Sequence, residues 1–379
     1  MRTTLLRQLL TIFMLLPVFV SVYADMAGAR KNLDKISLPE GFKISIFAEV
    51  PGARQMAFGQ SMGNIFVGTR SGEVYGVVDK DKDRNADKVV KMMSDLKMPN
   101  GVAMHQGFLY IAENHRIVRY PGVGFSLELP WEEMAEVIYE GMPTSLHHGW
   151  HYIRFSKDNK LYVSVGAPCN ICKVKGIEGT IIRMDANGSN MEVFAHGIRN
   201  SVGFDFHPLT DVLHFTDNGV DMMGDLIPPG EFNAADKAGL HFGFPYYAGG
   251  KERHKDWNKK KPPANVTFPV IEFGAHAAAL GTLFYTGNTF PAEYRNDALI
   301  AQHGSWNRSE AFGYRLMRIK FDDKGKAKTK EVFADGWLNS GEAWGRPVDI
   351  LQLPDGSILV SDDYQGVIYR ISYEGESGS

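Results

Sequence analysis

Short β-rich runs recur along this chain, and their spacing limits the folds that the chain can adopt. The runs are NIFVGT (64–69), FLYIAE (108–113), KLYVSVG (160–166), DVLHFTDN (211–218), DALIAQHG (297–304) and SILVSDD (357–363). Several are followed by a second strand-like run, namely EVYGVVD (73–79), RIVRY (116–120), TIIRMD (180–185), YRLMRIKF (314–321) and VIYRISY (367–373). Repeats of roughly 40–50 residues with about four strands each are typical of a β-propeller. The six recurrences predict an all-β, six-bladed β-propeller that forms one domain over residues 25–379.

Two further segments complete this outline. The strand-like run FKISIF (42–47) follows the N-terminal leader, and we expect it to pair into the last blade and remove an open sheet edge. The longest gap between runs contains a Gly-, Pro- and Lys-rich segment at about 222–275, which we interpret as an insertion. Its KERHKDWNKKKPP stretch is short and interrupted by acidic residues, so a solvated loop is favoured over a basic recognition surface.

The N-terminus has the pattern of a secretory signal. Arg2 and Arg7 precede an apolar run over residues 9–22, and small residues follow up to Ala24. This pattern predicts a signal peptide, residues 1–24, that is cleaved after Ala24. An uncleaved membrane anchor is the alternative, but Pro17 and the shortness of the run argue against it. We therefore expect a periplasmic or secreted protein without a membrane span after cleavage.

Charge and cysteine content narrow the function further. The net charge of -3 gives no basic face for nucleic acid, so we expect no nucleic-acid partner. The two cysteines, Cys169 and Cys172, are spaced C-x-x-C, which in an oxidising compartment predicts a local disulfide that stiffens a loop. A thioredoxin-like redox role would need a βαβ context, and a zinc site would need a second ligand pair.

Histidines stand just before the third recurrent strand. His148 lies in HHGWH, ten residues before the Asp-Asn turn that leads into KLYVSVG, at the expected mouth of a blade. A neutral imidazole there could act as a general base toward a sugar hydroxyl. A histidine held in the loop by hydrogen bonds is the alternative, and the neighbouring His147 and His151 leave the choice of base open.

A cation and an acidic turn follow at the next strand ends. Arg199 and Asn200 come after the strand-like EVFAH and could offer several donors to an oxyanion, or Arg199 could bridge loops across the channel. The strand DVLHFTDN runs into an Asp-Asn-Gly-Val-Asp turn at 217–221. Its carbonyl and carboxylate oxygens suit a hard cation such as calcium, although Asn-Gly by itself is usually a plain turn.

Further basic and aromatic residues hold equivalent places in other blades. HGSWNRS begins at His303 and contains Trp306, on which a planar ligand could stack, and Arg308. Arg346 precedes the last blade, and Arg54 holds the same place before the first. Arginines that enter the channel from several blades would form a cationic well, which favours a small polyanion such as a multiply carboxylated cofactor.

A separate acidic stretch, DKDKDRNAD, matches part of an EF-hand-like calcium loop. Its carboxylates occupy positions 1, 3, 5 and 9, which are Asp79, Asp81, Asp83 and Asp87. Arg84 replaces the turn glycine of that pattern, and the glutamate of position 12 is absent. A structural calcium site and a plain acidic turn both remain open, and neither is catalytic.

The succession of these motifs resembles the pyrroloquinoline quinone (PQQ)-dependent sugar dehydrogenases of the soluble six-bladed type, closest to the L-sorbosone dehydrogenase-like branch. The matching segments extend from about residue 38 to 373, and they are LYVSVG with CNIC, GIRNSVGFDFHP, GAHAAALGTLFYTG, HGSWNRS, WGRP with LPDGSILVSDD, and IYRISY. The resemblance implies PQQ and calcium as cofactors. It implies roles for a base (His148), an Arg-Asn pair over the quinone (Arg199, Asn200), a carboxylate holder (Arg346), and main-chain calcium ligands in the turn that contains Asp217, Gly219 and Val220.

The last blade departs from the pattern of the soluble glucose dehydrogenases. That pattern has two arginines separated by one residue, whereas here Arg346 is followed by Pro-Val. The PQQ-contacting lysine of the family has no match, and we expect His303, Trp306 or Arg308 to take over its contact.

The resemblance implies oxidation of an aldose or sugar aldehyde to the lactone or acid by hydride transfer to the quinone. Calcium and Arg199 would polarise the quinone C5 carbonyl while His148 removes a proton from the substrate, and a periplasmic acceptor would take the electrons. One alternative is a calcium-dependent propeller lactonase, which needs a ring of Asp, Glu and Asn around a central metal. The other is a non-catalytic propeller that binds carbohydrate or protein.

Overall fold

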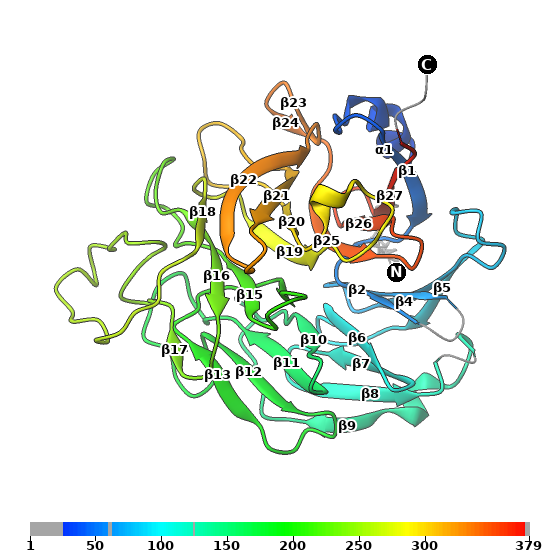
Figure 1. Cartoon of the computed structure of the whole chain (residues 1–379). Coiled ribbons are helices and arrows are strands. Elements are labelled where there is room, and N and C mark those ends of the chain that lie inside the picture. Colours follow the sequence, from blue (N-terminus) through cyan, green and yellow to red (C-terminus); the bar gives the residue numbers. More distant parts are fainter. Residues whose placement is uncertain (1–25, 60–62, 124–125, 376–379) are drawn as a thin grey trace, which may run out of the picture.

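The protein is a ring of β-sheets. The computed structural model describes residues 26–59, 63–123 and 126–375, and the predicted signal peptide, residues 1–24, lies outside them. These described residues form six sheets of at least four strands each, arranged around a central axis (Figure 1). The first strands of neighbouring sheets contact one another near the axis, and the other strands follow outward. The all-β, six-bladed propeller expected from the recurrent runs is confirmed.

Each of the first three blades is an antiparallel sheet built in chain order. Blade 1 contains β2 (Met56–Phe58), β3 (Ile65–Gly68), β4 (Val74–Val78) and β5 (Lys88–Met93). Blade 2 contains β6 (Gly101–His105), β7 (Phe108–Ala112), β8 (Ile117–Pro121) and β9 (Glu136–Tyr139). Blade 3 contains β10 (Ile153–Phe155), β11 (Lys160–Val165), β12 (Thr180–Asp185) and β13 (Glu192–His196), to which the short β17 (Leu240–His241) is added in parallel.

The remaining blades depart from this simple order in two ways: blade 4 skips one strand of the chain, and blade 6 takes its outer strand from the N-terminal part of the chain. Blade 4 contains β14 (Phe204–Phe206), β15 (Leu213–Asp217), β16 (Gly230–Ala235) and β18 (Ile271–Phe273). Blade 5 contains β19 (Ala279–Phe284), β20 (Ala298–Gln302), β21 (Arg315–Phe321) and β22 (Ala327–Ala334). Blade 6 contains β25 (Pro347–Gln352), β26 (Ile358–Asp362), β27 (Val367–Tyr373) and, from the other end of the chain, β1 (Phe42–Glu49).

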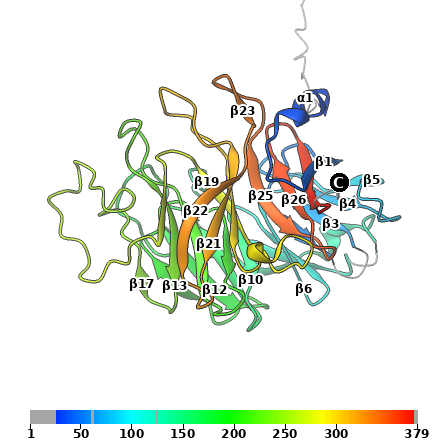
Figure 2. The same ribbon diagram turned by 45° about the horizontal axis from the view of Figure 1, so that its top comes forward.

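A few short elements lie outside the six blade sheets. They are α1 (Met26–Asn32), the 3₁₀ turns η1 (Leu33–Lys35), η2 (Trp131–Met134) and η3 (Ala292–Tyr294), and the hairpin of β23 (Leu338–Asn339) and β24 (Glu342–Ala343). Figure 2 shows α1 and the β23–β24 hairpin projecting on the same side of the ring. None of the helices in the described residues is long and apolar enough to cross a membrane.

The segment 222–275, which the sequence presents as an insertion, contributes two of the four strands of blade 4. β16 and β18 lie within it and pair with each other as the outer half of blade 4. The part that leaves the blade is therefore the shorter run 236–270, whose β17 attaches to β13 of blade 3. The sequence missed this because β16 is interrupted by polar residues and β18 is only three residues long.

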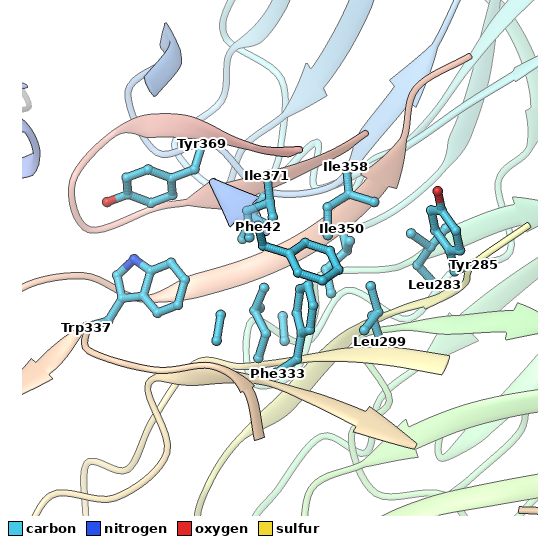
Figure 3. Close-up of a cluster of buried hydrophobic side chains, with 14 of the residues drawn as sticks. Phe42, Leu283, Tyr285, Leu299, Phe333, Trp337, Ile350, Ile358, Tyr369 and Ile371 are labelled. Carbon is cyan, nitrogen blue, oxygen red and sulfur yellow. The ribbon is translucent and has the colours of Figure 1, made fainter. Parts of the chain in front are cut away.

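The hydrophobic core is divided among the seams between blades. Six buried clusters each combine residues of two neighbouring blades, so that every sheet is covered on both faces. This explains the sequence pattern: β3 and β20 are buried along their whole length and are apolar at nearly every position. The cluster between blades 5 and 6 is the one drawn in Figure 3.

The N-terminal strand closes the ring. β1 pairs antiparallel with β27 from Phe42↔Tyr373 to Glu49↔Val367, as expected from the alternating FKISIF run. Phe42 enters the cluster of blades 5 and 6, with its ring 4.7 Å from that of Phe290 and 5.2 Å from that of Phe333 (Figure 3). The last blade is thus built from both ends of the chain, and no blade has to end in an open gap.

We predict that Phe42→Ala destabilises the protein by about 3–5 kcal/mol, because it empties the aromatic contacts that hold β1 in the last blade. Denaturant unfolding measures this change in the free energy of unfolding. Lys43→Ala is the control, since Lys43 is exposed and forms a surface ion pair with Glu374, which is worth at most about 1 kcal/mol. A similar small loss for both variants would contradict a closing role for β1.

Candidate active site

One end of the ring carries a cavity of about 330 Å³. In an antiparallel four-stranded blade, the turn between the second and third strands and the connection to the next blade lie at the same end. Residues from such connections in all six blades line the cavity. They are Arg54, Arg70, His148, Trp150, Arg199, Asn200, Asn218, Gly219, Asp221, Gly230, His276, Ala278, Leu280, His303, Gly304, Trp306, Asn307 and Arg346. The volume lies in the range of small-molecule and cofactor sites.

His148 lies buried in the wall of this cavity, between β9 and β10. Its Nδ1 is 2.9 Å from the carbonyl oxygen of Ala167, so Nδ1 carries the proton and Nε2 keeps the free lone pair. His148 has a positive φ of 52°, and its Cβ lies 2.5 Å from where a side chain on Gly166 would begin. The glycine at the end of β11 therefore permits this close approach.

Burial and positive charge keep the His148 ring neutral. Loss of water lowers the pKa of His148 to about 2, and the nearby Arg199 and His147 contribute to the same direction. The ring is therefore unprotonated at every physiological pH. Of the two other histidines in the motif, His151 is fully buried with its Nδ1 2.8 Å from the Ser164 oxygen and does not line the cavity, and neither does His147.

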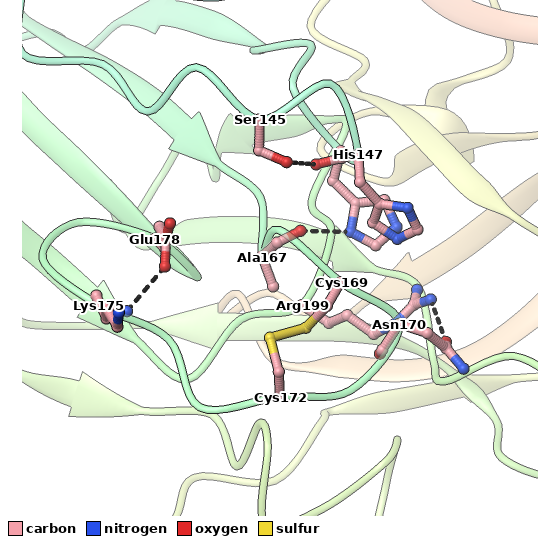
Figure 4. Close-up of a disulfide and its surroundings, with 10 residues drawn as sticks. Ser145, His147, Ala167, Cys169, Asn170, Cys172, Lys175, Glu178 and Arg199 are labelled. Atoms are coloured by element: carbon pink, nitrogen blue, oxygen red, sulfur yellow. Dashed lines mark hydrogen bonds between the residues drawn. A yellow bond between two sulfur atoms is a disulfide. The ribbon is translucent and has the colours of Figure 1, made fainter.

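Arg199 is held by the loop that the disulfide closes. Its Nε and Nη2 donate to the main-chain and side-chain oxygens of Asn170, at 2.8 and 2.7 Å. Nη2 also pairs with Asp221 at 2.7 Å, and Nη1 donates to the oxygen of Asn218 at 3.1 Å. Figure 4 shows Arg199 beside Asn170, next to the Cys169–Cys172 bond. The guanidinium is thereby fixed in one orientation at the cavity wall.

The predicted disulfide is present, and the described residues contain no free cysteine. Cys169 and Cys172 are separated by 6.1 Å between Cα atoms and enclose Asn170. Asn170 also binds the main chain of Asp221 through both its Oδ1 and its Nδ2. The short loop thus connects Arg199 to the turn after β15, which gives the disulfide a positioning task that the spacing of the cysteines did not specify.

Arg54 and His303 meet on a shared carboxylate. Asp363, just after β26, accepts hydrogen bonds from Arg54 Nη1 at 2.5 Å and His303 Nε2 at 2.8 Å. These two partners outweigh the effect of burial and hold the pKa of Asp363 well below its usual range. Arg54 also donates to Asn100 at 2.6 Å. Asp363 was not among the expected site residues, although it ends the SILVSDD run that was read as a strand.

Two further arginines face the cavity without a full set of partners. Arg70 stacks on Trp150, with its guanidinium carbon 3.9 Å from the ring centre, and burial and the charge of Arg54 lower its pKa. The Nε of Arg346 is buried with no hydrogen-bond partner. Positive charge gathered in one cavity favours an anionic occupant.

The other expected cofactor contacts are placed in different ways. Asn200 lines the cavity, and Trp306 stands at its rim with 70% of its surface exposed. Arg308 does not line the cavity, because its guanidinium donates to the carbonyl oxygens of Asp225 and Ala275 at 2.5 and 3.2 Å. Its neighbours in the HGSWNRS turn face the cavity instead, since successive residues of a turn point in different directions.

In the turn expected to hold the cofactor calcium, some residues line the cavity and others are buried in the interior. Gly219 lines the cavity, and Val220 is buried with its N–H bound to Ala248. The Asp217 carboxylate does not reach the cavity, since its two oxygens accept the backbone N–H groups of Arg199 and Asn200 at 2.8 and 2.6 Å. Asp217 therefore fixes the backbone of the Arg-Asn pair.

Arg70, Trp150 and Asp363 are thus functional candidates that were not among the expected site residues. Arg70 follows β3 just as His303 follows β20, so its position after a recurrent run was the signal that pointed to it. The ion pair between Asp363 and Arg54 joins residues that are 309 positions apart in the chain, so no local sequence pattern could reveal it.

Comparison with known proteins adds a family assignment. Residues 29–372 match the family model described as "Domain of unknown function (DUF7133)". This chain belongs to the DUF7133 family. A protein of Borreliella burgdorferi that is described only as an uncharacterized protein is 34% identical over 375 residues, which cover 96% of the DUF7133 chain and 97% of the relative.

Solved structures share the fold of the DUF7133 chain. A Trichoderma reesei enzyme of carbohydrate-active enzyme family AA12 superimposes with a TM-score of 0.76 at 17% identity, over 89% of this chain and 97% of that chain. The PQQ domain of a pyranose dehydrogenase from Coprinopsis cinerea, in its holo form, gives a TM-score of 0.71 at 17% identity with the same coverage. At this identity the likeness establishes the fold.

A second buried carboxylate stands behind Asp217. Glu231 pairs with it across β15 and β16 and accepts hydrogen bonds from Gly250 N and Asn233 Nδ2 at 2.6 and 2.8 Å. Burial raises the pKa of both carboxyls, and the charge of Asp217 raises that of Glu231 further. The folded protein therefore holds a proton here that the unfolded chain would release near pH 4.5.

We predict that this proton makes the unfolding free energy fall as pH rises from about 4.5 through the raised pKa of folded Glu231. Glu231→Gln keeps the shape without a titrating group, so its melting temperature relative to wild type should increase between about pH 5 and about pH 8, without added metal. The exposed Glu133→Gln is the control and should show no such trend. A constant difference between Glu231→Gln and wild type would contradict the buried proton.

Proposed function

We propose that this chain is a PQQ-dependent dehydrogenase that oxidises an aldose or sugar aldehyde to the lactone or acid. The carrying observation is the cavity itself, whose lining combines four arginines, including Arg346 with an Nε that has no hydrogen-bond partner, with a neutral histidine of defined tautomer. Among the described residues that line it, Asp221 is the one carboxylate. A small polyanion bound beside a base is what such a lining fits best.

The residues present fit PQQ by charge and by shape. Arg346, with its free Nε, and Arg70, stacked on Trp150, would hold carboxylates of the cofactor. Trp306 stands at the rim, where a planar ring could stack. Arg54 and His303 would contact the cofactor less directly, because both side chains already bind Asp363.

The calcium of the cofactor would be held by main-chain oxygens of Gly219 and Val220. Gly219 lies at the cavity wall, and carbonyl oxygens are ligands that calcium accepts readily. Asp217 would contribute indirectly, since its carboxylate is engaged with the backbone of Arg199 and Asn200. When bound, PQQ with calcium would supply an electrophilic quinone that accepts a hydride.

His148 would remove the proton from the substrate hydroxyl through Nε2. The hydrogen bond from Nδ1 to Ala167 fixes the ring and leaves Nε2 as the acceptor. Bound carboxylates would offset the arginine charge and raise the pKa of His148 again, which strengthens it as a base. Arg199 would stabilise negative charge on the reacting carbonyl, because Asn170 and Asp221 hold its guanidinium at the wall.

The reduced cofactor would pass its electrons to an acceptor in the periplasm or outside the cell. The disulfide is consistent with an oxidising compartment, so we place the protein in the periplasm or outside the cell. No partner is expected beyond the sugar and this acceptor.

Two other functions are less well supported by the same cavity. A calcium-dependent lactonase needs several carboxylate and amide ligands around a central metal, whereas Asp221 is the one carboxylate among the described lining residues and is already paired with Arg199. A purely binding propeller gives no reason for several arginines in the same cavity as a neutral histidine of fixed orientation.

The proposal predicts that the purified chain reduces an artificial dye with aldoses or sugar aldehydes only when PQQ and calcium are both added. His148→Gln should lower kcat by about 10²- to 10⁴-fold while PQQ binding, followed by fluorescence quenching, stays within a few-fold. His196→Gln is the control and should stay near wild type, since His196 is exposed at the end of β13 and does not line the cavity. Absence of PQQ binding at micromolar concentrations with calcium present would contradict the dehydrogenase.

The disulfide loop gives a second prediction. Asn170→Ala removes the side-chain oxygen that holds Arg199 and should weaken PQQ affinity or lower kcat by about 10- to 100-fold, because a charged hydrogen bond is lost. The exposed Asn187→Ala, in the turn after β12, is the control. Equal activity of the two variants would show that Arg199 needs no support from the loop.

A further inference from the structure

The acidic loop between β4 and β5 brings three carboxylates to one point. One oxygen each of Asp79, Asp81 and Asp87 lies within 4.8 Å of the others. Calcium–oxygen distances are about 2.3–2.6 Å, so two ligands on opposite sides of one ion are separated by about 4.6–5.2 Å. A single calcium ion can therefore contact all three residues.

The interior of the loop also contains a carboxylate oxygen without a partner. The Asp79 side chain is 9% exposed, and its Oδ1 is buried with no hydrogen bond. Its Oδ2 lies 4.0 Å from the guanidinium of Arg84, which is a long ion pair. A buried carboxylate oxygen that has no hydrogen-bond partner is stabilised when a cation contacts it.

The loop lies on the seam where the ring closes. Arg84 pairs with Asp355 of the β25–β26 turn at 2.9 Å, and the N–H of Ala86 donates to the oxygen of Phe47 in β1 at 2.8 Å. Both partners belong to blade 6, whereas the loop belongs to blade 1. Connections between third and fourth strands lie at the end of the ring away from the cavity, so this loop is separate from the cofactor site.

We infer that this loop binds a calcium ion through Asp79, Asp81 and Asp87 and thereby fastens blade 1 to the strand that closes the ring. Main-chain oxygens and water complete the coordination sphere. With three carboxylates, we expect a Kd of about 10⁻⁴–10⁻³ M, as in extracellular calcium modules. The inference does not depend on the proposed dehydrogenase activity.

Asp83 provides a matched control within the same loop. Its two carboxylate oxygens are directed to Asn85, at 2.7 Å from the backbone N and 3.4 Å from Nδ2, and it is not part of the group of three. The sequence pattern placed it at the third ligand position, but the short Asx turn at Asn85 draws it away. Asp83→Asn removes one charge from the loop without removing a proposed ligand.

The test compares wild type, Asp79→Asn, Asp81→Asn and Asp83→Asn without PQQ, in chelator and in about 5 mM CaCl₂. We expect calcium to raise the Tm of wild type and of Asp83→Asn by roughly 1–3 °C, and that of the other two variants clearly less. Hydrogen exchange of the amides at 80–88 should slow with calcium in the same two proteins. Magnesium at the same concentration is the comparison ion, and it should give the smaller shift.

Two results would overturn the inference. The first is a wild type whose Tm and amide exchange do not respond to calcium. The second is a response that survives in Asp79→Asn and Asp81→Asn, because it would then come from another site such as the cofactor calcium. Either result leaves the PQQ-dependent activity to stand or fall by its own test.

Discussion

The pairing of β1 with β27 is the interaction on which the rest of the structure depends. The cavity is lined by connections from all six blades, so its arginines reach their positions only if the ring is closed. Closure joins residues from opposite ends of the chain and is supported by Phe42 in the cluster between blades 5 and 6. The core is divided among six seams, and close packing at each seam fixes how one blade is positioned against the next.

The cavity concentrates positive charge that the protein offsets only in part. Asp363 forms an ion pair with Arg54 and accepts a hydrogen bond from His303, and Asp221 forms an ion pair with Arg199. Arg346 keeps an unpartnered Nε, and that imbalance is the physical reason to expect an anionic occupant. The same charge, together with burial, keeps His148 neutral, so a base and a cationic binding site are produced by one arrangement.

Much of the fold and part of the cavity lining could be predicted from the sequence, because both are encoded in local sequence patterns. Inner strands covered on both faces appear as continuous apolar runs, so their recurrence revealed the number of blades. Residues next to the ends of these runs, such as His148, Arg199 and Arg346, were correctly expected to converge. Arg308 does not line the cavity, since neighbouring side chains of one turn point in different directions. The sequence did not reveal β16 and β18 as blade strands, because β16 contains polar residues and β18 has only three residues.

The sequence by itself therefore determined the repeat, the blade number and the type of residue delivered to the mouth of each blade. The tertiary structure decided which of these residues are paired and which are free. Asp217 binds backbone amides behind the wall, Asp363 joins Arg54 to His303, and the Asp79 oxygen remains without a partner. Such pairings depend on contacts between residues far apart in the chain, and a local sequence pattern contains no information about them.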